Sequence, residues 1–236
     1  ATMLRDQGVD IILNAHVKRI SHHENQVQVH SEHAQLAVDA LLIASGRQPA
    51  TASLHPENAG IAVNERGAIV VDKRLHTTAD NIWAMGDVTG GLQFTYISLD
   101  DYRIVRDELL GEGKRSTDDR KNVPYSVFMT PPLSRVGMTE EQARESGADI
   151  QVVTLPVAAI PRARVMNDTR GVLKAIVDNK TQRMLGASLL CVDSHEMINI
   201  VKMVMDAGLP YSILRDQIFT HPSMSESLND LFSLVK

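Results

Sequence analysis

The sequence has little of several features that mark common classes of protein. Its single cysteine, Cys191, excludes an internal disulfide framework and a zinc site built from cysteines. The longest stretch without a charged residue, 122–134, is too short to span a bilayer and contains three prolines. Basic residues are not in excess, since 24 Lys and Arg face 29 Asp and Glu and leave a net charge of -5. We therefore expect no nucleic-acid partner and no membrane partner, and a reducing, cytoplasmic setting, because no signal-peptide pattern opens the chain.

What is present is typical of a folded protein. Hydrophobic residues make up 43% of the 236 residues, which is enough to bury the core of one large domain or two modest ones. Residues 1–7 have the pattern of a helix end that Gly8 terminates, and Val9–Leu13 is predicted to be a buried strand. Because the pattern enters a helix in its last turns, we expect the chain to begin inside a domain. A short frayed N-terminal helix is the alternative.

Short strands are expected up to about Arg47. Residues 26–30 and 35–39 alternate polar and apolar positions, and 31–34 lies between them as a turn. Residues 40–44 form a continuous apolar run that ends in Ser45-Gly46-Arg47-Gln48-Pro49. A buried strand that stops at Gly and then Pro is typical of the edge of an α/β sheet near a ligand crevice.

A second block, from about Thr51 to Gly113, delivers a carboxylate directly after a glycine. We predict strands at 68–71 and 82–85, then Gly86-Asp87, a Gly90-Gly91 turn and a helix over 97–110 that Gly111 ends. An aspartate in this place suits hydrogen bonding to a ribitol or ribose hydroxyl, because glycine lets a ligand approach closely. Taken alone, a role of Asp87 in a turn or a helix cap explains the pattern equally well. The charged segment 114–121 is predicted to be an exposed linker.

The last block, 122–236, is predicted to consist of five strands and several helices. Thr139-Glu140-Glu141-Gln142 fits a capping box that opens a helix to about Ser146, which Gly147 closes. The helix expected over 194–207 is apolar around most of its circumference, so we expect a subunit interface as its second cover. The strands are expected at 124–129, 134–138, 151–157, 171–178 and 183–191.

One segment near the end, Thr220-His221-Pro222-Ser223-Met224-Ser225-Glu226, places an imidazole close to a carboxylate. An imidazole is a natural proton shuttle for a thiol, and a nearby carboxylate can fix its tautomer. Ser223 is also a good N-cap for the last helix with Glu226 at its N3 position, so a capping box explains both residues without catalysis. Spacing alone favours the capping box over a catalytic pair.

Four motifs together resemble a known family, the FAD-dependent pyridine nucleotide–disulfide oxidoreductases. Their spacing runs through the whole chain, which makes the combination far more specific than any one of them. The resemblance implies an α/β fold in which partial FAD- and NAD(P)-binding domains precede an α+β dimerisation domain, an antiparallel sheet flanked by helices. The implied boundaries are 1–47 for the end of the NAD(P)-binding domain, 48–121 for the returning segment of the FAD-binding domain, and 122–236 for the dimerisation domain. The motifs are Ala44-Ser45-Gly46-Arg47-Gln48-Pro49, Thr78–Gly90, Val123–Glu140 and the His221-Pro222 segment.

The resemblance also implies roles for individual residues. His221 takes the position of the family's acid–base histidine and Glu226 that of its partner, which reverses the preference for capping. The implied FAD-binding residues are Gly46, Arg47, Gly86, Asp87 and Thr95, with Asp87 on the ribitol. Two positions depart from the family's pattern. Phe219 stands where the family often has a second histidine, and Tyr96 follows Thr95 where many members have proline.

Three parts of the family's machinery are absent from this sequence: the N-terminal phosphate loop for FAD, the glycine fingerprint for NAD(P) and the pair of redox cysteines. We therefore expect the C-terminal portion of a flavoprotein disulfide reductase that uses NAD(P)H and FAD. The parent enzyme would pass electrons through flavin and a cysteine pair, its redox-active centre, to a disulfide, an oxidant or a metal ion. It would be a homodimer whose subunits share the active site. The alternative is that the isolated chain is a non-enzymatic dimerisation module.

Other reactive residues have simpler explanations. His195-Glu196-Met197-Ile198-Asn199 nearly matches a zinc motif, but Asn199 stands where the second imidazole ligand belongs. Cys191 ends a hydrophobic strand and is predicted to pack in the core. We expect no metal site. The histidines around the predicted hairpin are expected to be exposed turn residues, with a metal sensor as a third hypothesis. They are His22, His23, His30 and His33.

Overall fold

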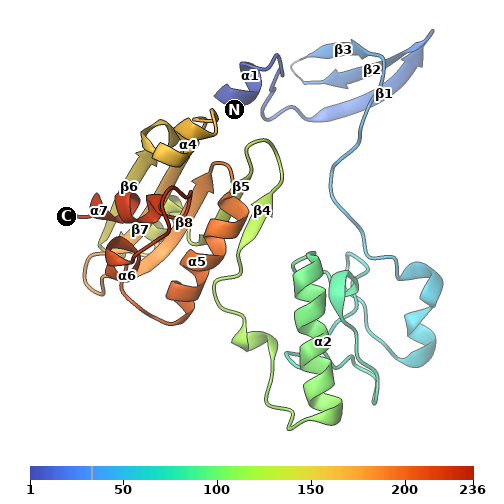
Figure 1. Ribbon diagram of the computed structural model, residues 1–236. Helices are drawn as coiled ribbons and strands as arrows, with labels where there is room; N and C mark the ends of the chain where they lie inside the picture. Colours follow the sequence, from blue (N-terminus) through green and yellow to red (C-terminus); the bar gives the residue numbers. More distant parts are fainter. Residues whose placement is uncertain (33) are drawn as a thin grey trace. The chain divides into compact units, whose positions relative to one another are not determined.

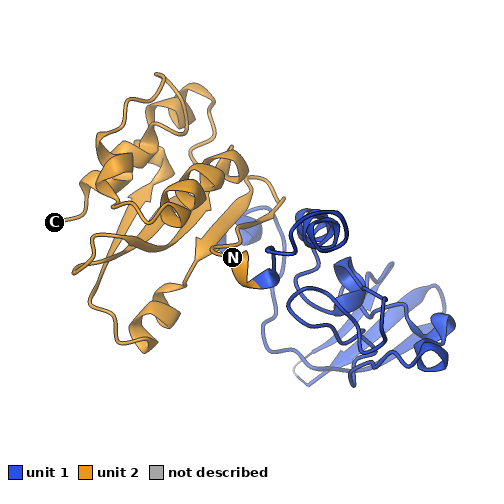
Figure 2. Cartoon of the chain, turned by 90° about the horizontal axis from the view of Figure 1, so that it is seen from below, with its two compact units in different colours: residues 1–117 blue, residues 118–236 orange. Residues whose placement is uncertain are grey.

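The computed structural model describes residues 1–32 and 34–236, which form two compact units (Figures 1 and 2). The first unit comprises Ala1–Thr117 and the second Asp118–Lys236. A short 3-10 helix, η4 (Thr117–Asp119), lies at their boundary. No helix in the described ranges is both long and apolar enough to cross a membrane.

The first unit opens with a short helix and a three-stranded antiparallel sheet of order β1-β2-β3. Helix α1 (Thr2–Arg5) has Asp6 as its C-cap, so it ends earlier than predicted. Gly8, whose φ is +84° and whose N–H donates to the Arg5 carbonyl, lies in the turn that follows. The expected alternating strands are confirmed, and Ser31 and Ala34 close the turn between them through a 2.9 Å backbone hydrogen bond. The strands are β1 (Val17–His23), β2 (Gln26–Ser31) and β3 (Gln35–Val38).

Two predicted buried strands are wrong. Residues 9–13 and 40–44 are not in strands, and their large side chains are exposed, with Leu13 at 70% and Leu42 at 88%. A strand that is apolar on both faces needs hydrogen-bonded neighbours and cover on both sides. No segment among the described residues pairs with either stretch.

The rest of the first unit is built from short helices and turns packed around one long helix. The segments predicted as strands at 68–71 and 82–85 form only isolated bridges, Val63 with Ile69 and His76 with Trp83, so regular strands there are also wrong. Helix α2 (Thr95–Leu110) begins earlier than predicted and ends, as predicted, at Gly111. The short 3-10 helices are η1 (Ala52–Leu54), η2 (Pro56–Ala59) and η3 (Gly86–Thr89).

The second unit is a five-stranded antiparallel sheet of order β4-β5-β8-β7-β6 with helices packed on it (Figure 1). All five predicted strands are confirmed within a few residues of their expected ends. The capping box at α3 (Glu140–Glu145) is formed, because the Thr139 hydroxyl accepts the Gln142 N–H and the Gln142 side chain accepts the Thr139 N–H. The strands are β4 (Tyr125–Val127), β5 (Leu133–Gly137), β6 (Ile150–Pro156), β7 (Val172–Asp178) and β8 (Met184–Leu190).

Alternation along these strands directs one face of the sheet into the core, where it packs against α5 and α7. On β7, for example, Leu173, Ala175 and Val177 are fully buried. On helix α5, the side with Met197, Ile198 and Val201 is buried, whereas Met203 on another side is exposed. The remaining helices of this unit are η5 (Val157–Ala159), α4 (Pro161–Val165), α5 (Ser194–Asp206), α6 (Ser212–Asp216) and α7 (Ser227–Ser233).

Candidate functional site

The Gly86-Asp87 segment forms a tight turn that two glycines make possible. Gly86 has a φ of +79° and begins η3, and Gly90 ends it with a φ of +72°. A Cβ at Gly90 would lie 2.7 Å from the Cβ of Ala68, and a Cβ at Gly86 would lie 3.0 Å from the Ser98 hydroxyl. The turn is therefore closely packed underneath, while the Asp87 carboxylate above it stays half exposed.

Arg47 and Asp87, forty positions apart in the chain, lie together in the structure. The Arg47 Nη1 atom is 3.5 Å from Asp87 Oδ2, and both side chains are more than half exposed. Gly46, directly before Arg47, has a φ of +119°, which a side-chain-bearing residue rarely adopts. An exposed ion pair of this kind contributes about 0–1 kcal/mol, so it does not withdraw the carboxylate from a ligand. Two of the motifs thus converge on one polar surface.

Thr95, the fifth predicted cofactor residue, is exposed at the first position of α2. It makes no hydrogen bond or ion pair with Arg47 or Asp87 in the described structure, so the site brings together fewer residues than predicted. Its neighbours Phe94 and Tyr96 stack with ring centroids 5.0 Å apart, and burial raises the pKa of Tyr96. Tyr96, stacked on Phe94, is thus the residue at the position where the family pattern often has proline.

His221 and Glu226 form a close pair in the second unit. The His221 Nδ1 atom lies 2.9 Å from each carboxylate oxygen of Glu226. The imidazole is 65% exposed, whereas the Glu226 side chain is half as exposed. Because Nδ1 is held by the carboxylate, the tautomer is fixed and Nε2 is the atom left to exchange a proton.

The predicted capping box at this place is only half formed. The Ser223 hydroxyl accepts the Glu226 N–H at 3.2 Å, but α7 begins at Ser227 and has Glu226, not Ser223, as its N-cap. The prediction of Ser223 as the N-cap is therefore wrong. The backbone after Ser223 forms a turn of i→i+3 bonds, such as Ser227 N–H to the Met224 carbonyl, before the α-helix begins. The second half of the box is missing because the Glu226 carboxylate contacts the His221 imidazole.

Comparisons with known proteins identify the family of the chain. Residues 1–101 match the family model described as pyridine nucleotide-disulphide oxidoreductase, and residues 123–232 match the model of the dimerisation domain of the same proteins. The chain belongs to this oxidoreductase family. The predicted fold class, with an antiparallel sheet flanked by helices in the dimerisation domain, is confirmed.

Individual relatives agree with the family models. The chain is 99% identical over its 236 residues to the probable pyridine nucleotide-disulfide oxidoreductase RclA of Escherichia coli strain K12, of which it covers 54%. It is 32% identical over 229 residues to a mercuric reductase of Staphylococcus aureus, covering 95% of this chain and 42% of that protein. The chain therefore spans about half the length of the curated relatives it matches. The motifs suggest a likeness to the reactive chlorine resistance flavoprotein of enteric bacteria, and the match to RclA confirms it.

A solved structure has the same fold. The Cu(II) complex of the HOCl-induced flavoprotein disulfide reductase RclA from Escherichia coli superposes with a TM-score of 0.98 at 99% identity. The match covers 100% of this chain and 54% of that one.

Among the residues that the structure describes, the remaining reactive residues contact neither the Arg47–Asp87 pair nor the His221–Glu226 pair. Cys191 is fully buried with its Sγ atom 3.8 Å from the Met197 Sδ atom, and burial raises the pKa of the thiol to about 12. It therefore stays a protonated core residue, as predicted. His195 packs edge-on against Phe128, and the Asn199 side chain donates to the His195 carbonyl instead of completing a metal site.

The hairpin histidines give no metal cluster in the part of the chain that the structure describes. Among residues 1–32 and 34–236, no three or more His, Cys, Asp or Glu side chains lie close enough together to hold a metal ion. The His30 imidazole instead contacts Arg19 and Ser21, at 3.3 Å each. His33 lies outside the described residues.

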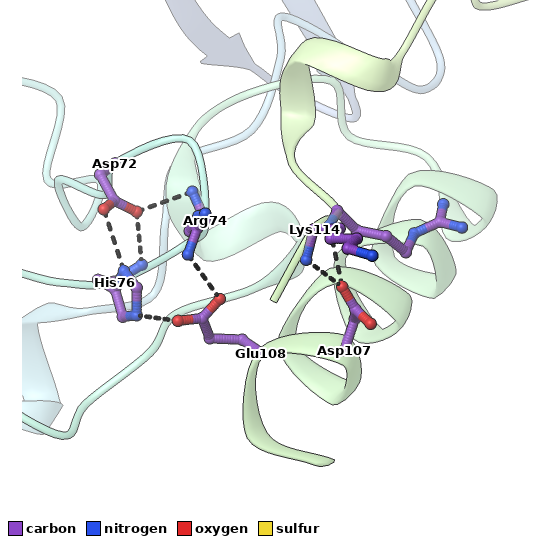
Figure 3. A network of polar contacts seen from close by, with 7 residues as sticks. Asp72, Arg74, His76, Asp107, Glu108 and Lys114 are labelled. Atoms are coloured by element: carbon purple, nitrogen blue, oxygen red, sulfur yellow. Dashed lines mark hydrogen bonds and ion pairs between the residues drawn. The ribbon is translucent and has the colours of Figure 1, made fainter. Parts of the chain in front are cut away.

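Sequence reasoning missed a polar network that anchors the C-terminal end of α2 (Figure 3). His76 lies between two carboxylates, 3.0 Å from Asp72 through Nδ1 and 3.4 Å from Glu108 through Nε2, and Arg74 also contacts Glu108. Burial works against ionisation of Asp72, but hydrogen bonds from His76 and Arg74 lower its pKa. In the sequence, the only signal of this network is that its four members are polar; three of them lie within 72–76 and the fourth is Glu108.

Sequence reasoning also missed Asp101, which is buried on α2 beside the Gly86 turn. The available signal was its place on the helix, four residues after Ile97 and three before Ile104 on the apolar stripe. A carboxylate on a buried stripe needs a polar partner, and this one accepts the Gly86 N–H.

Proposed function

We propose that the chain is the C-terminal part of a FAD-dependent NAD(P)H oxidoreductase. The parent enzyme passes electrons through flavin and a cysteine pair to a disulfide, an oxidant or a metal ion. Family membership and the 99% identity to RclA support this function. The names of two relatives, a mercuric reductase and a Cu(II) complex, support a metal ion among the acceptors. In this proposal residues 1–47 end the NAD(P)-binding domain, 48–121 return to the FAD-binding domain and 122–236 form the dimerisation domain.

The observation that carries the proposal is the His221–Glu226 pair. Glu226 holds Nδ1 of an exposed imidazole, so Nε2 is free to give a proton to a departing thiolate or to take one from a thiol. In a homodimer, each protomer would lend this group to the flavin and cysteines of its neighbour. The exposure of the ring is what such a role in a second subunit requires.

The residues of the first unit fit FAD at the Gly86 turn. A bound FAD would supply the two-electron chemistry that this chain's own side chains lack. Asp87 would accept hydrogen bonds from ribitol hydroxyls, and Arg47 and Gly46 would line the same surface. The half-exposed Asp87 carboxylate beside the exposed Arg47 side chain supports this fit, because both groups are accessible to a ligand.

Replacing Asp87 tests the flavin site. In the 99% identical Escherichia coli protein, which matches the full length of this chain, Asp87→Ala at the matching position is expected to weaken FAD binding by on the order of tenfold, the value of one hydrogen bond to a charged group. The ratio of visible to protein absorbance after dialysis measures the retained flavin. The control is Asp80→Ala, an exposed carboxylate shortly before the turn. Full flavin occupancy in the Asp87 variant would contradict the assignment.

The second candidate function is a dimerisation module without enzymatic activity of its own. The match of residues 123–232 to a dimerisation domain and the exposed Met203 on α5 favour it for the isolated chain. We expect the 236-residue chain to elute from size-exclusion chromatography as a colourless dimer. A yellow complex would show that the chain binds flavin without a phosphate loop, and a monomer would contradict the module. A cytoplasmic location stays a prediction.

A further inference from the structure

The most deeply buried carboxylate of the first unit's helix lies directly behind the turn that presents Asp87. Asp101 on α2 is only 1% exposed, and its Oδ2 atom accepts the Gly86 N–H at 2.6 Å. Gly86 is the residue immediately before Asp87 and the first residue of η3. The proposed function makes no use of Asp101, although a buried carboxylate is costly unless its partners are well placed.

The contact has a clear physical effect on the turn. The first N–H groups of a helix have no partner inside the helix, and a negative charge at this end is favourable. Asp101 satisfies the N–H of Gly86 and so fixes the plane of the peptide that enters the turn. A second α2 side chain, Ser98, lies against Gly86 from the same side. The orientation of Gly86 is therefore set by α2.

We propose that Asp101 is a positioning residue for FAD binding, which acts by holding the Gly86 turn so that the Asp87 carboxylate faces the ribitol chain. This inference rests on the proposed role of Asp87. Neighbouring carboxylates on α2 have other partners. Asp100 pairs with Arg115 at 3.0 Å, and Asp107 accepts the backbone N–H groups of Lys114 and Arg115. Asp101 is the carboxylate of this helix that bonds to the turn.

A double-mutant cycle on the 99% identical Escherichia coli protein separates positioning from general stabilisation. The variants are Asp101→Ala, Asp87→Ala and both together, with Asp100→Ala as the matched control on the same helix. The dissociation constant of FAD is measured by adding FAD to the apoprotein and following flavin fluorescence. We expect Asp101→Ala to weaken FAD binding on the order of tenfold in the wild-type background. In the Asp87→Ala background we expect a further loss of less than about threefold, because the two residues act as one unit. Asp100→Ala should leave the constant unchanged.

The conservative variant Asp101→Asn keeps an oxygen that accepts the Gly86 N–H, and it should restore FAD affinity to within about threefold of wild type. The Asp101→Asn variant also tests the proposal if Asp101→Ala does not fold. An Asp101→Asn variant that loses as much FAD affinity as Asp87→Ala would overturn the proposal. Fully additive losses in the cycle would assign Asp101 to fold stability alone and overturn it as well. If Asp87→Ala itself leaves FAD affinity unchanged, the proposed flavin site fails, which is a separate result from the Asp101 measurements.

Discussion

Replacing His221 by alanine in the 99% identical Escherichia coli protein is expected to slow thiol-dependent turnover by about 10²–10⁴-fold while flavin stays bound. The reason is that Nε2, with its tautomer fixed by Glu226, is the atom placed to move a proton to or from a thiol. Steady-state reduction of a disulfide or metal-ion acceptor gives the rate, and the visible flavin absorbance gives the cofactor content.

The chain offers a matched control for this experiment. His55 is also 65% exposed and also holds a glutamate, Glu57, through Nδ1 at 3.1 Å, but it lies in the first unit far along the sequence. His55→Ala should leave turnover unchanged. Equal rates for the His221 variant and the wild type would remove His221 from the catalytic assignment, whereas equal losses in both histidine variants would indicate a non-specific effect.

Truncating Phe232 should destabilise the second unit by about 3–5 kcal/mol, the usual cost of removing a buried aromatic ring. Phe232 is fully buried on α7, where it packs in the core and lies 6.0 Å from the ring of Tyr211. Because Glu226 is the N-cap of the same helix, the loss of packing also loosens the carboxylate that holds His221. Urea unfolding of the chain, followed by circular dichroism, measures the change.

The control for this substitution is Phe128→Ala, since Phe128 is 78% exposed. Its effect on the free energy of unfolding should be within about 0.5 kcal/mol. Unfolding midpoints that agree between the Phe232 variant and the wild type would show that α7 contributes little to the core.

The strands of the second unit could be predicted well from sequence because the signals that mark each strand are local, although their pairing is not. Each of its strands pairs antiparallel with a strand of the same chain, and their alternation and glycine turns mark the ends. The predictions at 9–13 and 40–44 were wrong for the opposite reason. A continuous apolar run indicates a strand only if neighbours exist to pair with it, and the described chain provides none there.

In the candidate site, too, contacts between residues close in the sequence could be predicted, whereas contacts between distant residues could not. The closeness of His221 and Glu226 follows from their spacing, but their contact could not be told from capping until the direction of the carboxylate was known. The pairing of Arg47 with Asp87 depends on how the intervening residues fold, which no periodicity reveals. Asp101 was missed because a single acidic residue on an apolar stripe has no local signature of its partner.

The close approach of Gly90 to Ala68 has an evolutionary consequence. Since a methyl group at position 90 would lie 2.7 Å from the one at position 68, the two sites share room for a single carbon atom. Shrinking residue 68 would not free position 90, because the φ of +72° at Gly90 disfavours any side chain whatever the space. Position 90 should therefore stay glycine across divergent homologues, whichever residue stands at position 68.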